Sequence, residues 1–399
     1  MSDWKEITLG EIATITMGQS PKGEDCNTDG HGLPLLNGPT EFGHRHPYPI
    51  QFTTDPKKKA VCGDLLFCVR GSTTGRMNWA DQEYAIGRGI ASIRSKCETH
   101  IQLYIKAVID QHLKELLAVA TGSTFPNVSR DDLSNLRLLS PPSDVRDFIS
   151  ELANTIDRKI ENLRKQNETL EAIAQTLFKH WFVDFEFLNE DGKPYKSSGG
   201  EMVRSELGEI PAGWNVGKLG DFGKVITGKT PSTQNPNYWD SGLPFVTPTD
   251  FKNYGKFVLN SEREISNLAM SEFKSLIIPD KSVVVTCIGS DMGKVARTAT
   301  QCITNQQLNS LVFDRIRNGM EYAYQFLVSQ YKMLRLMALG GSTMPIINKT
   351  AFSNIEIVIP DFLTLDKFNE IVEPFNLKVI NNEQQIQTLT KQQFQIQNF

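Results

Sequence analysis

The chain carries a long internal repeat. Residues 4–21 (WKEITLGEIATITMGQSP) and 214–231 (WNVGKLGDFGKVITGKTP) align without a gap at an offset of 210 residues. The register continues to a Gly-Ser-Thr-x-Pro motif at 122–126 and 341–345, where the offset has grown only to 219. Solenoid units are at most about 50 residues long, so a repeat of this length predicts two copies of a whole domain.

Composition excludes several classes of protein. A chain of 399 residues with 39% hydrophobic and 22% charged residues is long enough for two cores, and it is neither disordered nor fibrous. No apolar run reaches the roughly 20 residues that span a bilayer, and the start MSDWKE lacks the apolar core of a secretion signal. We therefore expect a cytoplasmic protein with no membrane partner. The net charge of −4 argues mildly against an autonomous nucleic-acid binder.

Cysteine and histidine usage predicts no metal site. The six cysteines form no CxxC pair, so free thiols in a reducing compartment are expected. Cys26, His31, His44 and His46 lie close in sequence, but they lack the paired spacing of structural zinc ligands. The second copy has no equivalent set.

Each copy begins with a globular part of mixed structure. Short apolar runs separated by Gly, Pro and Asn predict strands at matching places, over 64–69, 90–93, 282–288 and 308–313. Apolar residues at helical spacing predict one helix over 101–119 and another over 322–339. Each copy is therefore expected to be an α+β domain.

A long helix is predicted to follow each globular part. Pro141-Pro142 ends the first part, and apolar residues then recur alternately every four and three positions, which is typical of a coiled-coil seam. The predicted seam includes Ile156, Ile160, Leu163, Asn167 and Leu170 in the first helix, and Val379, Asn382, Ile386 and Leu389 in the second. About 33 residues would give a rod of roughly 50 Å. The two rods are expected to pack as an antiparallel coiled coil, with Pro374 kinking or delaying the second.

Asn167 and Asn382 interrupt the apolar seam. A polar residue at such a position can fix the register and the partner at some cost in stability. In an antiparallel pair the two could meet near the middle. Alternatively, each is a polar residue tolerated on an exposed turn, and periodicity does not decide between these possibilities.

Two globular modules and two long helices make the chain resemble the DNA-specificity (S) subunit of type I restriction-modification systems. The resemblance covers essentially the whole chain and is carried by residues 17–21, 86–89, 178–185, 227–232 and 305–307. It implies tandem target-recognition domains at 1–142 and 214–361, a helical spacer at 143–185, a linker at 186–213 and a C-terminal helical spacer at 362–399. The halves would then be related by an internal pseudo-two-fold axis.

The resemblance also implies a function without catalysis. Each recognition domain would read one half of a split target in double-stranded DNA. The helices would set the gap between the halves and dock two methyltransferase (M) subunits, with restriction (R) subunits joining the complex. This chain would bind no cofactor, because S-adenosylmethionine, ATP and Mg are expected on the partner subunits.

Loop residues with suitable side chains are the candidates for DNA contact. An arginine fork matches guanine O6 and N7, an amide matches adenine N6 and N7, and lysine suits phosphate. The candidates are Arg70, Arg76 and Arg88 for guanine, Asn305, Gln306 and Gln307 for adenine, and Lys57, Lys58 and Lys229 for phosphate. The recurring motif adds Ser342 and Thr343, either as a DNA-facing loop or as a turn before the last strand.

Two signals resemble enzyme motifs. Residues 223–230 fit the phosphate-binding pattern GxxxxGK[ST], but that pattern needs a helix at its end, and Pro231 follows at once. Asn235-Pro236-Asn237-Tyr238 resembles the Asn-Pro-Pro-Tyr of adenine methyltransferases, but the βαβ alternation of a cofactor fold is missing. A DNA-modifying enzyme, either a fused adenine methyltransferase or a nuclease, and a protein-only coiled-coil adaptor are kept as alternatives.

Overall fold

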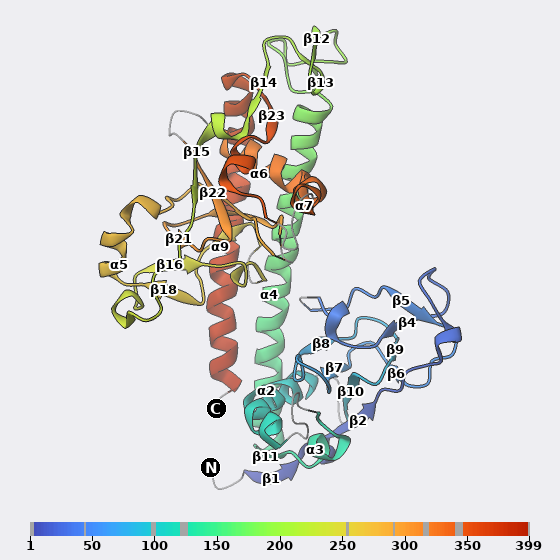
Figure 1. The fold of residues 1–399 in the computed structure, drawn as a ribbon. Coiled ribbons are helices and arrows are strands. Elements are labelled where there is room, and N and C mark those ends of the chain that lie inside the picture. The colour runs from blue at the N-terminus through green and yellow to red at the C-terminus, as the bar shows by residue number, and fades with distance from the viewer. Residues whose placement is uncertain are drawn as a thin grey trace. The chain divides into compact units, whose positions relative to one another are not determined.

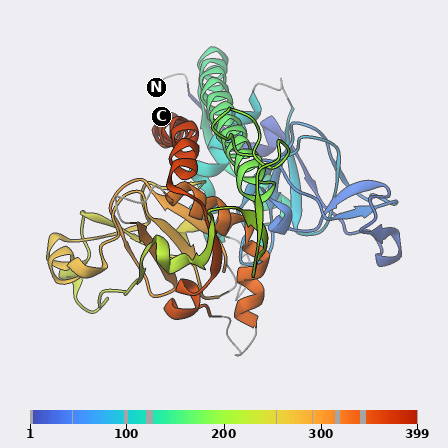
Figure 2. The ribbon, with the colours of Figure 1, turned by 90° about the horizontal axis from the view of Figure 1, so that it is seen from above.

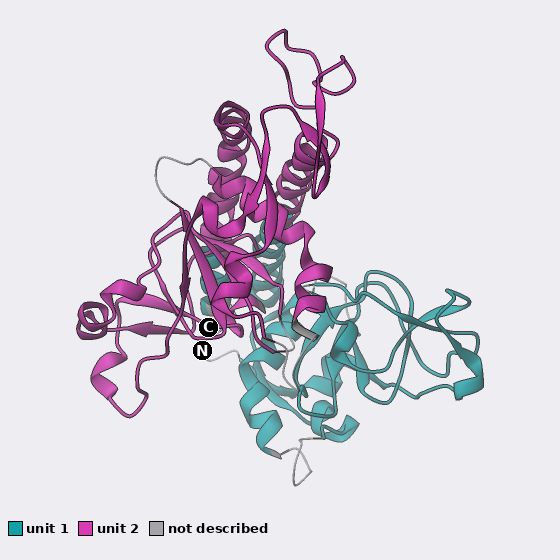
Figure 3. Cartoon of the chain, turned by 45° about the horizontal axis from the view of Figure 1, so that its top comes forward, with its two compact units in different colours: residues 1–162, 387–399 teal, residues 163–386 magenta. Residues whose placement is uncertain are grey.

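A computed structural model describes most of the chain. The described residues are 4–43, 45–96, 101–119, 127–252, 255–289, 292–313, 319–339 and 346–397. They form two compact units, residues 1–162 with 387–399 and residues 163–386 (Figure 3). The division falls inside two long helices, α4 (Ser143–Phe178) and α9 (Phe362–Gln397), so each helix contributes to both units.

Unit 1 is built on two sheets. One has the antiparallel order β2 (Ala13–Met17), β10 (Ile90–Ser95), β7 (Leu65–Cys68), β8 (Met77–Trp79). The other has the order β3 (Cys26–Asn27), β5 (Gln51–Thr53), β4 (Leu33–Leu36), β9 (Tyr84–Ile86), β6 (Lys59–Ala60). A separate pair joins β1 (Lys5–Thr8) to β11 (Arg137–Ser140), and the helices are α1 (Leu9–Ile12), α2 (Gln102–Val119) and α3 (Arg130–Ser134).

Unit 2 repeats this plan. Its main sheet has the order β15 (Gly223–Thr227), β22 (Leu308–Phe313), β19 (Val283–Thr286), β20 (Val295–Thr298), β17 (Phe257–Val258). A second sheet has the order β18 (Arg263–Ile265), β16 (Leu243–Val246), β21 (Ile303–Thr304). Two further pairs join β14 (Asn215–Lys218) to β23 (Glu356–Ile359) and β12 (Met202–Ser205) to β13 (Gly208–Pro211). The parallel pair β4·β9 of unit 1 corresponds to the parallel pair β16·β21.

The central strand of each main sheet is buried on both faces. In β7, Leu65 and Phe67 join a core packed against α2, whereas Leu66 joins a second core with Tyr84. Successive strand side chains point to opposite faces, so one strand serves two cores. β19 does the same, because Val283 and Val285 belong to one cluster and Val284 to another. This explains why both strands read as continuous apolar runs instead of alternating ones.

The helical segment over 322–339 differs from the single helix that the sequence predicts. The structure has two helices, α6 (Met320–Ser329) and α7 (Tyr331–Leu339), so that prediction is wrong in this detail. Gln330 leaves the helical region, at φ −89° and ψ 13°, and its N–H is shared between the carbonyls of Phe326 and Leu327. A shared bond of this kind tightens a last helical turn and ends it. The short helices α5 (Asn267–Glu272) and α8 (Lys349–Ser353) complete unit 2.

The two long helices lie side by side (Figure 1 and Figure 2). Within unit 2 they run antiparallel: Asn167 contacts Asn382, and Trp181, beyond the end of α4, contacts Phe368. Pro374 does not delay the second helix, as the sequence suggested, because α9 begins at Phe362. Proline has no N–H, so the carbonyl of Glu370, four residues earlier, lacks its helical hydrogen bond. Pro374 and Glu370 are both exposed, so water can bond this carbonyl instead.

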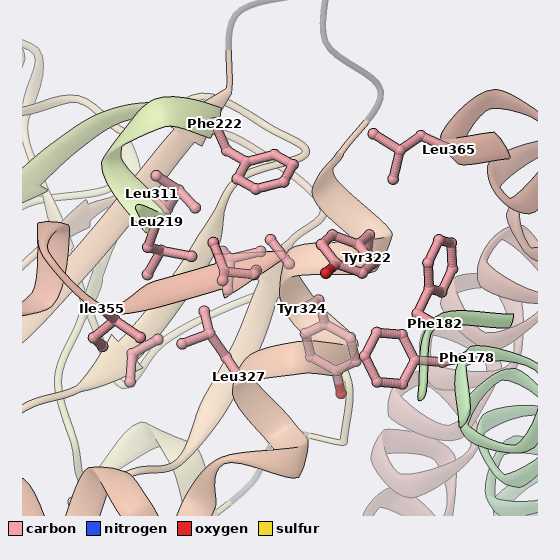
Figure 4. Packing of buried hydrophobic residues seen from close by; sticks show 14 of the residues in the cluster. Phe178, Phe182, Leu219, Phe222, Leu311, Tyr322, Tyr324, Leu327, Ile355 and Leu365 are labelled. Atoms are coloured by element: carbon pink, nitrogen blue, oxygen red, sulfur yellow. The ribbon is translucent and has the colours of Figure 1, made fainter. Parts of the chain in front are cut away.

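An aromatic cluster fixes the end of α4 inside unit 2. α4 continues into one π-helical turn over Lys179–Val183, which turns Phe182 toward the core. Phe182 lies edge-on to Tyr322 of α6 at 4.7 Å and to Phe368 of α9 at 5.0 Å between ring centroids. Figure 4 shows Phe178 and Phe182 facing Tyr322 in this cluster. Such edge-to-face contacts stabilise beyond the burial of area alone.

The cysteines described by the structure carry free thiols, at positions 26, 62, 68, 287 and 302. Burial raises the pKa of the Cys287 and Cys302 thiols to about 12, so both are unreactive packing groups. Cys97 lies outside the described residues. Over the described ranges, no helix combines the length and apolar character needed to cross a bilayer.

Candidate nucleic-acid interface

The same two loops meet at one edge of the main sheet in both units. In unit 1 the chain leaving β2 bonds to the turn between β9 and β10, with Gly18 N–H donating to Ile90 O (2.9 Å) and Gln19 N–H to Ile86 O (2.9 Å). In unit 2, Gly228 N–H donates to Leu308 O (3.2 Å) and Lys229 N–H to Thr304 O (2.9 Å). The loops that the sequence repeat picks out are therefore neighbours in space.

Glycine is required at this contact in both units. A Cβ built on Gly18 would lie 2.2 Å from the Gly87 carbonyl oxygen, and one on Gly228 would lie 2.1 Å from that of Thr304. Both obstacles are main-chain atoms, which cannot move aside as a flexible side chain could. Close approach of two backbones is a common reason for glycine.

The turn presents one exposed polar side chain at the same place in each unit. Gly89 O accepts from Val69 N–H in unit 1, and Gln307 O accepts from Cys287 N–H in unit 2, so Arg88 and Gln306 are equivalent. The first loop supports the turn in both cases. Ser20 Oγ accepts from Arg88 N–H at 3.3 Å, and Thr230 Oγ1 donates to Gln306 Oε1 at 2.6 Å.

A shallow hollow in unit 1 collects two of the predicted guanine readers. Arg70 follows β7 and donates from Nε to Asn127 Oδ1 at 3.1 Å. The hollow of about 610 Å³ is lined by Ser20, Pro21, Cys26, Asn37, Arg70 and Arg88. Two guanidinium groups with nearby amide and hydroxyl groups suit a ligand that is rich in acceptors.

Two of the remaining candidates of unit 1, Arg76 and Lys57, are bonded within their own module. Arg76 donates to the carbonyl oxygens of Pro39 and Phe42, both at 3.3 Å, so its fork is already used. Lys57 is paired with Asp55, and this hydrogen bond raises the pKa of Lys57. Lys58 is exposed.

The candidates of unit 2 also divide into exposed residues and residues bonded within the module. Lys229 is exposed, with Nζ 5.8 Å from the centre of the Phe273 ring, a cation–π contact. Asn305 is buried, and its amide bonds Gln307 through Nδ2 to Oε1 (2.9 Å) and through Oδ1 to the Gln307 N–H (3.0 Å), so it shapes the turn. Gln306 is the exposed member of the three. Ser342 and Thr343 lie outside the described residues.

Comparison with known proteins gives the family of this fold. The family model described as "Type I restriction modification DNA specificity domain" matches residues 1–172 and again 211–391. The chain belongs to this family. It is a specificity subunit of a type I restriction-modification system, the non-catalytic component that recognises the DNA target.

Relatives match the specificity subunit over nearly its full length. The type I restriction enzyme HindI specificity subunit of Haemophilus influenzae is 27% identical, with 96% of this chain and 93% of that protein aligned. The MjaIX specificity subunit of Methanocaldococcus jannaschii is 27% identical over 98% of this chain and 90% of that protein. The crystal structure of an S subunit from M. genitalium aligns with a TM-score of 0.56 at 14% identity, over 99% and 95% of the two chains, and supports the fold.

Some residues beside the candidate DNA-contacting side chains were not selected from the sequence. Asn37 lines the hollow beside Arg88, and its amide donates to Gln51 Oε1 at 3.0 Å. Ser20 Oγ bonds the Arg88 N–H, and Thr230 Oγ1 bonds the Gln306 side chain, so both residues contact the exposed turn. The sequence repeat already aligns Ser20 with Thr230, within motifs 17–21 and 227–232, whereas the position of Asn37 depends on long-range packing.

The motifs that resemble enzyme sites have structural roles. β15 covers Gly223–Thr227 and no helix follows through residue 235, so residues 223–230 lack the amide cradle of a phosphate loop. Asn235 Oδ1 accepts from Asn237 N–H at 3.2 Å, and the Tyr238 hydroxyl donates to Glu272. Within the described ranges, no three His, Cys, Asp or Glu side chains converge as metal ligands; His44 lies outside them.

Proposed function

We propose that this specificity subunit reads a bipartite target in double-stranded DNA, with one half-site for each recognition domain. The observation that carries the proposal is the recurrence of one loop pair in both units with different side chains at its tip, Arg88 and Gln306. A repeated framework with different tips suits two similar readings of two different sequences.

The chemistry of the two tips suggests which bases each half contains. In the major groove an arginine fork pairs with guanine O6 and N7, and a glutamine amide pairs with adenine N6 and N7. We assign Arg88 and Arg70 to guanine in the first half-site and Gln306 to adenine in the second. Arg76, Asn305 and Gln307 are proposed to hold the loops in shape, because Arg76 donates to two carbonyl oxygens and Asn305 and Gln307 bond each other twice. Gln306 and Arg70 each make one such bond, to Thr230 and Asn127, which we propose orients them toward the base.

Phosphate contacts are proposed to be shared with partner subunits. Three exposed lysines are the candidates for phosphate: Lys229 in the first loop of unit 2, and Lys57 and Lys58 elsewhere in unit 1. Lysine suits phosphate as a point charge. The 42 Lys and Arg residues are outnumbered by 46 Asp and Glu, so the chain as a whole does not attract the DNA backbone electrostatically. The family to which the chain belongs implies the partners of the proposed complex: two methyltransferase subunits and restriction subunits, with S-adenosylmethionine, ATP and Mg on those partners.

The helices are proposed to set the gap. Residues 143–185 and 362–399 would form the spacer between recognition domains at 1–142 and 214–361, with residues 186–213 as linker. An α-helix rises 1.5 Å per residue, so the 36 residues of α4 span roughly 54 Å. That is enough to hold two reading surfaces about one DNA turn apart, roughly 34–36 Å.

Mapping of modified bases tests the proposal. The chain is expressed with its methyltransferase partners in a host free of other adenine methylation, and modified adenines are located across the genome. We expect one motif of two short defined halves separated by a constant undefined gap. A single contiguous motif would exclude the two-reader account, and S-adenosylmethionine bound to the purified chain alone would favour a modifying enzyme.

A coiled-coil adaptor predicts a different result in a binding experiment. Such a protein would assemble with its partners and still bind no duplex, at low or at high salt. Our proposal predicts tight, salt-dependent binding of the mapped target by the assembled complex. A scrambled duplex of equal length should bind far more weakly.

A further inference from the structure

A cation of the first recognition domain reaches the long helix. Arg45 forms an ion pair with Asp157 of α4, and its Nε lies 4.0 Å from Glu161 on the next turn of the same helix. All three side chains are largely buried, with 15% to 24% of each exposed. The pair is therefore partly shielded from water, where an ion pair has more effect than on an open surface.

The second domain makes a similar link by different residues. Lys256 Nζ lies 2.9 Å from Glu171 Oε2 of α4 and 2.6 Å from Glu321 Oε1 of α6, and 4% of the Lys256 side chain is exposed. Gln325 Nε2 bonds the same two carboxylates at 3.0 Å and 2.9 Å. One buried ammonium thus connects the recognition domain to the helix.

The two cations occupy one position of the repeated fold. Arg45 O accepts from Trp79 N–H at 2.8 Å, and Lys256 O accepts from Arg297 N–H at 2.8 Å. Trp79 pairs with Leu65 of β7 just as Arg297 pairs with Val283 of β19. Both copies therefore place a cation beside the same strand and direct it to α4, although one is arginine and the other lysine.

Such links are better suited to fixing a position than to raising stability. Desolvation offsets most of the attraction in a buried ion pair, so replacing it by apolar groups is often neutral or stabilising. Apolar packing tolerates small sliding of one surface over another, whereas a buried ammonium is satisfied only where its carboxylates lie. The charges persist over a wide pH range: burial alone would raise the pKa of Glu321, but Lys256 and Arg297 lower it to about 2.

We propose that Arg45 and Lys256 are matched positioning residues that hold each recognition domain at one place on α4 and so define the permitted gap between half-sites. The inference rests on the proposed bipartite reading. Neither residue needs to touch DNA, because each acts through the placement of its domain.

The test compares gap tolerance in assembled complexes. Arg45→Met and Lys256→Met are purified with the methyltransferase subunits, and methylation rates are measured on duplexes with the mapped gap and with one base pair more or fewer. We expect the ratio of native-gap to altered-gap rates to fall by about tenfold in each variant, while the half-site preference is kept. The control is Lys59→Met, because Lys59 pairs with Glu83 inside the same domain; its ratio should not change.

Two further variants guard against a folding defect. Asp157→Asn removes the partner charge and should relax the gap like Arg45→Met, whereas Arg45→Lys keeps a cation, as the second domain does, and should retain the wild-type ratio. If the variants lose activity equally on all gaps, the residues are only structural and the inference fails. If the wild-type complex itself shows no preferred gap, it is the bipartite proposal that fails.

Discussion

At the scale of single residues, Arg88 carries the sharpest expectation. Arg88→Gln gives unit 1 the side chain that unit 2 has at the equivalent turn, Gln306. We expect one base of the first half-site to change preference from guanine toward adenine, with a discrimination change of about 1–3 kcal/mol. The second half-site should stay the same. Genome-wide mapping of modified adenines reports both halves in one experiment.

A surface arginine of the same unit is the matched control. Arg137 lies on β11 and pairs with Glu6 of β1, in a two-stranded sheet separate from the main sheet whose strands carry the proposed reading loops. Arg137→Gln removes the same charge but should leave the whole motif unchanged. A shift in both half-sites with Arg88→Gln, or a shift with Arg137→Gln, would contradict the assignment.

Glu383 gives a pH-dependent expectation. Burial raises the pKa of this α9 carboxyl from 4.5 to about 7, against a smaller opposing effect of the Lys256 backbone N–H. The folded state therefore holds the proton more tightly than the unfolded state, and folding loses stability as pH rises from about 4.5 to 7. Glu383→Gln removes this loss, so the variant should be more stable than wild type at pH 8 by about 1–3 kcal/mol.

The difference should shrink as pH falls toward 4.5. Chemical denaturation of both proteins across that range measures it. Glu370→Gln, an exposed substitution on the same helix, controls for the change of side chain. A Glu383→Gln stability difference that is the same at every pH would show that the carboxyl is not held in its protonated form.

At the scale of elements, the helix pair contains a polar contact in a mostly apolar seam. Asn382 is fully buried and donates from Nδ2 to Asn167 Oδ1 at 2.8 Å and to Gln166 Oε1 at 3.3 Å. Leu163 and Val379 are buried, whereas Leu170, Ile386 and Leu389 are half-buried. In unit 1, Ile156 and Ile160 are buried as well. A buried amide pair of this kind favours one register of the two helices.

Substitution of the two asparagines tests that role. Asn167→Leu leaves the buried Asn382 amide without its closer acceptor and should lower the free energy of unfolding by about 1–3 kcal/mol. The double substitution by leucine should recover most of that loss, because it removes both polar partners together. Urea denaturation of wild type, of Asn167→Leu and Asn382→Leu separately and of the double variant measures the coupling. Losses that simply add would show that the two amides act independently.

Elements were predictable from the sequence where the signal is local. The alternation of three and four residues marks α4 and α9 because it follows the face that each helix buries. The break at Gln330 and the continuation of α9 through Pro374 were not predictable in this way. The first depends on one shared hydrogen bond, and the second on Pro374 and Glu370 lying on the solvated side.

At the scale of the whole molecule, the repeat gave the two-module organisation and family motifs gave the function. The residues of the proposed reading turn were only partly predictable from the sequence. The sequence selected Arg70, Arg88 and Gln306 together with Arg76 and Asn305, because all five have side chains that suit base contact. Only the fold shows that the polar groups of Arg76 and Asn305 are hydrogen-bonded to other residues of their own module. The equivalence of Arg45 and Lys256 was hidden, because it is defined by main-chain bonds between distant segments.

The central claim is that each recognition domain reads its own half-site independently. A chain in which residues 1–142 replace residues 214–361 tests it, with co-purification of the methyltransferase subunits as evidence of assembly. Mapping of modified adenines for that complex should show the first half-site twice, as an inverted repeat across a constant gap. A motif that still contains the original second half-site, although residues 214–361 are gone, would contradict the account.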